Sequence, residues 1–169
     1  GTPTNNLKWT WSTWLKRGAV NSGAVENIFT TYVDASNLFY IRFEDTDCIY
    51  IRNIASVGTG GKLITNAKYR DPAAWYHIVF VYDSANASAG DRMRLYVNGV
   101  EETVFSTDTN PTLNLDSLIN TSGNVINIGT YKDSGAVANE FFQVVMAHAH
   151  FCDGQAYAAS DFGETDSTS

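Results

Sequence analysis

This chain has little of the chemistry on which common catalytic and metal-binding motifs depend. It has two cysteines, Cys48 and Cys152, and their separation matches no metal-finger spacing. We expect two buried thiols that behave as small apolar side chains, with a single long-range disulfide as the alternative. The sequence also has no Gly-x-Ser-x-Gly, the pattern of the nucleophile elbow found in many hydrolases.

Positive charge is scarce, above all in the second half of the chain. There are 11 lysines and arginines against 18 acidic residues, and the net charge is −7. Residues 95–169 hold ten acidic residues and one basic residue, Lys132, a net of −9. Because such a surface repels phosphate, we expect no nucleic-acid partner. No apolar run reaches the ~20 residues that a membrane helix needs, so we expect no membrane insertion.

Aromatic and β-branched residues are abundant instead, and they alternate with polar ones. In "LKWTWSTWLK" (7–16) the alternation places Trp9 and Trp11 on one face and Trp14 and Lys16 on the other. Further runs of this kind cover 27–33, 38–44, 48–54, 92–97, 125–131 and 141–151. Many short strands separated by turn residues predict an all-β, two-sheet antiparallel sandwich, formed by residues 1–169 as a single domain.

The segment 75–104 gives the clearest local signals. "WYHIVFVY" (75–82) is apolar on both faces, which predicts a central strand covered on both sides. Trp75 and His77 share one face of this strand, and we expect both in the core, with His77 hydrogen-bonded. Asn98-Gly99 predicts a tight hairpin, because both residues tolerate positive φ.

Two looser segments carry weaker expectations. "GTGGK" (58–62) predicts a flexible turn, and "NPTLNLDSLIN" (110–120) a helical turn. Near the end of the chain, Ser160 is expected to cap a short turn at "SDFGE".

Several quoted motifs together resemble a known family over most of the chain. "WTWSTWLKRG", "AWYHIVFVYD", "DRMRLYVNGVE", "INIGTY" and "MAHAHFCDGQAYAASDFGETD" are similar to the laminin G-like jelly roll of the concanavalin A-like lectin/glucanase superfamily. The resemblance implies a jelly-roll sandwich of two curved antiparallel sheets. The family usually has one more strand before the Trp-rich one, so we expect a domain excised from a longer protein.

The ending "DGQA…SDFGE" resembles modules of structural proteins in tailed bacteriophages. This resemblance implies a non-enzymatic, surface-exposed virion module that decorates the capsid or forms part of a tail fibre. Its partners would be other capsid or tail proteins, host-surface or environmental glycans, and further copies of the chain in a homo-oligomer. The alternatives are a carbohydrate-binding module of a secreted bacterial protein and, third, a glycoside hydrolase.

The carboxylates give little support to the hydrolase. Glucanases of the superfamily carry E-x-D-x-x-E on one strand, and the nearest cluster here is Glu44, Asp45 and Asp47. Glu44 and Asp45 are adjacent and would face opposite sides of a strand. A polar turn between two strands explains these residues better.

A sugar site needs an exposed aromatic face beside hydrogen-bonding groups. Trp14 is the first candidate, because it shares a face with Lys16 and other polar residues, and Tyr131 is the second choice, followed by Tyr157. For Trp14, a position packed between the two sheets is nevertheless the preferred interpretation.

Two kinds of metal site follow from residue type. Calcium prefers oxygen ligands, which Asp83, Asn86 and Asp91 offer in one loop, and Asp133, Ser134 and Glu140 in another. Both loops are also ordinary hairpin connectors.

The pair His148 and His150 is the other candidate, for a transition metal. Strand alternation places both on one face, with Ala147, Ala149 and Phe151 on the other. A third ligand is required, and nothing in the sequence places His77 beside them. A strand without metal is the preferred interpretation.

Overall fold

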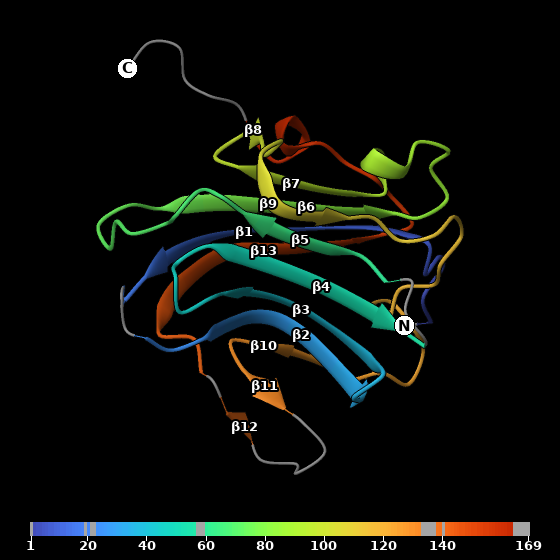
Figure 1. Cartoon of the computed structure of the whole chain (residues 1–169), viewed down its shortest axis with the longest axis horizontal. Helices are drawn as coiled ribbons and strands as arrows, with labels where there is room; N and C mark the ends of the chain where they lie inside the picture. The colour runs from blue at the N-terminus through green and yellow to red at the C-terminus, as the bar shows by residue number, and fades with distance from the viewer. Residues whose placement is uncertain are drawn as a thin grey trace.

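The computed structural model describes residues 2–18, 20, 23–56, 60–132, 138–139 and 141–163. Within them, two antiparallel sheets pack face to face (Figure 1). Sheet A has the order β13 (Val144–Asp153), β1 (Lys8–Arg17), β6 (Tyr76–Asp83), β7 (Met93–Val97) and β8 (Val100–Glu101). Sheet B has the order β10 (Ile126–Ile128), β2 (Glu26–Asp34), β3 (Asn37–Phe43), β4 (Ile49–Ala55), β5 (Lys62–Thr65) and β9 (Phe105–Thr109). The expected all-β jelly-roll sandwich is confirmed.

A short ribbon of β11 (Tyr131–Lys132) and β12 (Ala138–Asn139) lies beside β2. The described residues contain no helix with the length and apolar character that crossing a membrane requires.

An aromatic core fills the space between the sheets. Trp9 and Trp11 point inward from β1 and are fully buried, as predicted. Trp11 stacks on Phe29 of sheet B with ring centroids 4.9 Å apart, and Trp9 meets Phe39 edge-on at 5.5 Å. Each buried ring of this size removes a large apolar area from water, so these contacts dominate the packing of the two sheets.

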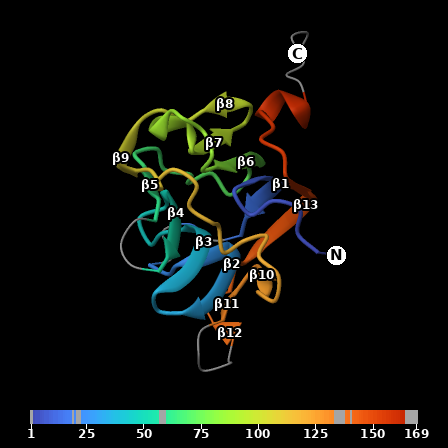
Figure 2. The same ribbon diagram turned by 90° about the vertical axis from the view of Figure 1, so that its right-hand side faces the viewer.

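Strand β6 is buried along its whole length, which confirms the prediction of a strand covered on both sides. Its inner face belongs to the aromatic core, and its outer face is covered by the C-terminal segment that follows β13 (Figure 2). Thr10 of β1 anchors this segment: its hydroxyl donates to the carbonyl of Gln155 at 2.8 Å and accepts from the N–H of Tyr157 at 2.9 Å.

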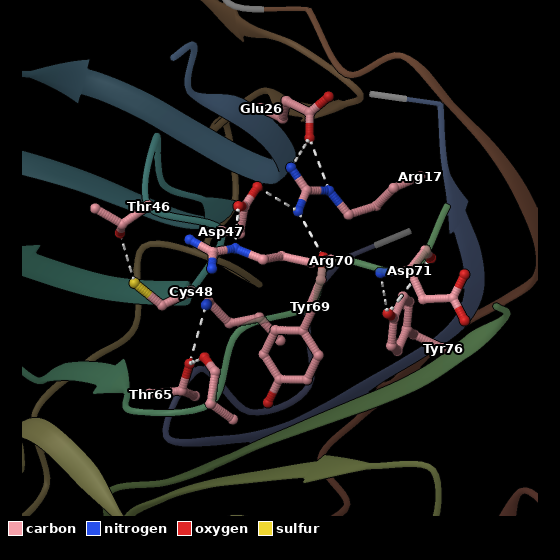
Figure 3. A network of polar contacts seen from close by, with 12 residues as sticks. Arg17, Glu26, Thr46, Asp47, Cys48, Thr65, Tyr69, Arg70, Asp71 and Tyr76 are labelled. Carbon is pink, nitrogen blue, oxygen red and sulfur yellow. Dashed lines mark hydrogen bonds and ion pairs between the residues drawn. The ribbon is translucent and has the colours of Figure 1, made fainter. Parts of the chain in front are cut away.

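A buried ion-pair cluster lies where β1 ends and β2 begins (Figure 3). The guanidinium of Arg17 bonds Glu26 at 2.7 Å and Asp47 at 2.9 Å, and Arg70 bonds the other oxygen of Asp47 at 2.8 Å. Arg17 also lies 4.3 Å from the ring centroid of Phe43. Burial outweighs the effect of Arg17 on Glu26, so the pKa of this carboxyl lies above its ordinary value.

The residues considered for the glucanase pattern lie in the turn between β3 and β4, as expected. Asp47 belongs to the buried cluster, and Glu44 pairs with Arg42 at 2.7 Å. Both carboxylates therefore already have cationic partners.

Two further predictions concern the hairpin after β7 and the state of the two cysteines. The Asn98-Gly99 hairpin is confirmed, with φ of 52° and 83°. Both cysteines are free thiols, so the disulfide alternative is wrong. Cys48 is buried as predicted, but Cys152 is only half-buried, so its predicted burial was wrong. Burial raises the pKa of the Cys152 thiol.

Two local predictions were wrong. Residues 110–120 form bends and hydrogen-bonded turns without a helical turn. The hydroxyl of Ser117 accepts from the N–H of Ile119, and the side chain of Asn120 donates to the carbonyl of Asn5 in the N-terminal segment. Ser160 lies inside the 3₁₀ turn Ala159–Asp161, and the carboxylate of Asp161 accepts from the N–H of Ala158. Of the predicted turn at 58–62, residues 58 and 59 lie outside the described residues.

Candidate functional site

A β-bulge in β13 shapes the outer face of sheet A. Ser12 pairs with His150 and Trp14 with Ala147, so β13 has one residue more than β1 over this stretch. His148 is this extra residue, and its backbone adopts a positive φ of 50°. Ala147 therefore lies on the Trp14 side of the sheet, and its predicted place on the opposite face with Phe151 was wrong.

Two tryptophans are exposed on this outer face. Trp14 is 37% exposed, so the preferred interpretation of packing between the sheets was wrong. Its ring stacks on the imidazole of His77 at 4.8 Å and 11°. Trp75 is 41% exposed, so its expected place in the core was wrong as well. It lies just before β6, the strand that is buried along its whole length.

These side chains line a groove with two compartments. One compartment, of about 230 Å³, is lined by Ser12, Trp14, His77, His148, His150 and Phe162. The other, of about 360 Å³, is lined by Trp14, Trp75, Ala147 and His148. Because Trp14 and His148 line both, we treat the compartments as one site and name it the Trp14 groove.

His77 forms the floor of the groove and is 5% exposed, as predicted for a core residue. Its Nε2 lies 2.9 Å from the hydroxyl of Ser12, and its backbone N–H donates to the side chain of Asn98 at 2.8 Å. Burial, and then the nearby His150, lower the pKa of His77 below its ordinary value. The imidazole beneath Trp14 is therefore neutral at neutral pH.

The groove brings together all three histidines of the chain, which the sequence could not foresee for His77. The rings of His148 and His150 lie 6.5 Å apart between centroids. Across the described part of the chain, no three His, Cys, Asp or Glu side chains are close enough to hold a metal ion. The arrangement suits hydrogen bonding to a ligand that lies against the tryptophans.

The other residues proposed for a sugar site, Lys16, Tyr131 and Tyr157, do not line the Trp14 groove. Lys16 is the next outward residue after Trp14 on β1 and lines a neighbouring hollow with Gln143 and Val145. Tyr131 lies on β11 beside sheet B, edge-on to Tyr32 at 5.7 Å, and does not line the groove. Tyr157 lies in the C-terminal segment against Phe162.

The predicted calcium loop is held in place by polar contacts within it and with neighbouring segments. Asp83 pairs with Lys8 at 3.2 Å, the side chain of Asn86 accepts from the N–H of Ser88, and Asp91 is exposed. The guanidinium of Arg92 donates to the carbonyls of residues 86, 87 and 111. Calcium at this loop stays a prediction. The second oxygen cluster, at residues 133, 134 and 140, lies outside the described residues.

Comparison with known proteins identifies the family of this chain. A laminin G-type family model, described as "Concanavalin A-like lectin/glucanases superfamily", matches residues 2–156. The chain belongs to this family. A search of curated proteins gave no match to this chain.

Solved structures share the fold at low identity. The CBM40 domain of Ruminococcus gnavus IT-sialidase is 10% identical with a TM-score of 0.64, covering 92% of this chain and 80% of that domain. A heptameric SAP-like pentraxin from Limulus polyphemus is 13% identical with a TM-score of 0.57, covering 86% of this chain. The chain spans 63% of the length of that pentraxin. A leech intramolecular trans-sialidase is 16% identical with a TM-score of 0.61, covering 92% of this chain and 22% of the enzyme.

Proposed function

We propose that this chain is a non-enzymatic carbohydrate-binding domain and that the Trp14 groove is its binding site. One observation carries the proposal: Trp14 and Trp75 expose their rings in the same groove, beside His148. A sugar ring has apolar C–H faces that pack on indole and polar hydroxyls that bond imidazole, so the groove offers both kinds of partner.

The comparisons support a carbohydrate ligand without identifying it. Structures of the R. gnavus CBM40 domain contain α2,3- and α2,6-sialyllactose. None of the proteins named above is described as a virion component, so the phage role stays a prediction from the resemblance of the C-terminal motif. The turn carboxylates Glu44 and Asp47 have cationic partners, which favours binding over hydrolysis.

Glycan-array screening of the protein, followed by calorimetric titration of the strongest hits, tests the proposal. We expect Trp14→Ala and Trp75→Ala each to weaken binding about tenfold or more, because centrally placed tryptophans contribute most to such contacts. Phe141→Ala is the matched control, since this exposed ring lies outside the groove.

Thermal melts establish that each variant is folded. An array without hits, or hits whose affinity both tryptophan variants leave unchanged, would contradict the proposal.

A further inference from the structure

The outer face of sheet B, on the opposite side of the molecule from the Trp14 groove, carries a row of basic and tyrosine side chains. They alternate with buried residues along β3, β4 and β5. We name this row the cationic ladder; it consists of Tyr40, Arg42, Tyr50, Arg52 and Lys62.

Contacts between rings and cations hold the ladder in place. The rings of Tyr40 and Tyr50 meet edge-on at 5.1 Å. The guanidinium of Arg42 lies 4.2 Å from the Tyr40 centroid and 5.0 Å from the Tyr50 centroid, and the ammonium of Lys62 lies 5.2 Å from the Tyr50 centroid. These contacts orient the cations before any ligand arrives.

The cross-strand register adds an unfavourable feature. Arg52 of β4 lies directly opposite Lys62 of β5, and like charges in this position destabilise a sheet. Arg42 has Glu44 as an ion-pair partner, whereas no ion pair of Arg52 or Lys62 exists among the described residues. Among the described residues, two cations without an ion-pair partner thus face each other in a chain whose net charge is −7.

We infer that the cationic ladder binds an acidic glycan, one whose sugars carry carboxylate or sulfate groups. A guanidinium offers parallel N–H donors that match both anions, and a neighbouring ammonium adds a second charge. Burial, and then a hydrogen bond with Tyr50, raise the pKa of Tyr40, so its hydroxyl stays uncharged beside the cations. The ladder is separate from the Trp14 groove and does not depend on the function proposed for it.

The test compares the wild-type protein with the double variant Arg52→Gln/Lys62→Gln in calorimetric titrations. The probes are heparin for sulfate, polygalacturonate and 3′-sialyllactose for carboxylate, and dextran and lactose as neutral counterparts. We expect the double variant to bind at least one acidic probe about tenfold more weakly or worse, because it loses charge-assisted hydrogen bonds. Its melting temperature should equal or exceed that of the wild type, since the like-charge pair is gone.

Arg94→Gln/Lys68→Gln is the matched control. It changes the net charge equally, and Arg94 lies 5.9 Å from the ring centroid of Tyr96 on the other sheet, as Lys62 lies 5.2 Å from that of Tyr50 in the ladder. Trp14→Ala completes the set and separates the two sites.

Each possible result of these titrations either supports the inference or overturns it. Loss of binding to heparin alone, or to the carboxylates alone, supports the inference and identifies the anion. Unchanged binding in the ladder variant, equal loss in the charge-matched control, or loss in Trp14→Ala alone overturns it. So does a DNA duplex that binds as tightly as the glycans, since the face would then attract any polyanion.

Discussion

Arg17 shows how much a single buried charge depends on its surroundings. Its side chain is 1% exposed and bonds Glu26, Asp47 and the carbonyl of Tyr69. We expect Arg17→Ala to lower the free energy of unfolding by about 3–5 kcal/mol, because two carboxylates would remain buried without their main cation. Urea denaturation followed by tryptophan fluorescence measures the loss.

Arg70 provides the comparison, since it bonds the same Asp47 but is 47% exposed. Solvent screens this pair, and Arg70→Ala should cost less than about 1 kcal/mol. Equal losses in the two variants would show that burial does not govern the strength of the cluster.

For single residues, the sequence predicted which face of a strand a side chain occupies better than it predicted which residues that side chain contacts. Alternation along β1 placed Trp9, Trp11 and Trp14 on the correct sides, and the same parity puts Arg17 on the inward face. Its partners come from the start of β2 and from two turns, and no local pattern joins such distant positions. Trp75 was misplaced because a strand pattern does not show where the covering layer ends.

Among the elements, the C-terminal segment contributes most to the outer side of sheet A. It covers the outer face of β6, contributes Phe162 to the Trp14 groove and depends on the hydroxyl of Thr10. We expect Thr10→Val to lower the free energy of unfolding by about 1–3 kcal/mol, because the N–H of Tyr157 loses its acceptor.

Amide hydrogen exchange provides the decisive readout for this variant. The amide of Tyr157 should exchange faster in Thr10→Val, while amides of the hairpin after β7 keep their rates. Unchanged exchange at Tyr157 would mean that the apolar contacts alone hold the segment.

Elements with their own turn chemistry were predictable, and those defined by pairing were not. Asn98-Gly99 adopts positive φ for reasons present in two residues, and β6 is apolar on both faces in its own sequence. The bulge at His148 exists only in relation to β1, so a strict period of two misplaced Ala147. The C-terminal segment has no repeating apolar pattern that would predict the surface it covers.

For the whole molecule, the buried imidazole of His77 connects folding to pH. Its pKa lies below the value of 6.5 expected for the unfolded chain. The unfolded state therefore takes up a proton first, and the free energy of unfolding should fall as the pH drops below 6.5.

Melting temperatures at about pH 7.5 and about pH 5 test this dependence. His77→Gln keeps a neutral polar group beside Ser12 and should show a smaller decrease than the wild type. An equal decrease in both proteins would assign the acid sensitivity to other groups.

At the same scale, the fold class followed from alternation, turn residues and resemblance together. The binding surfaces did not, because each combines strands that are distant in sequence. The Trp14 groove needs β1, β6 and β13 side by side, and the cationic ladder needs the register of β3, β4 and β5.

The bulge in β13 has one more consequence, for solubility. This ten-residue strand is the edge of sheet A, with β1 as its only pairing partner in the described structure. A long flat edge is a template on which a second chain can add strand by strand and aggregate. The kink at His148 interrupts the regular row of backbone donors and acceptors, so we expect the edge that shapes the groove also to resist such stacking at high protein concentration.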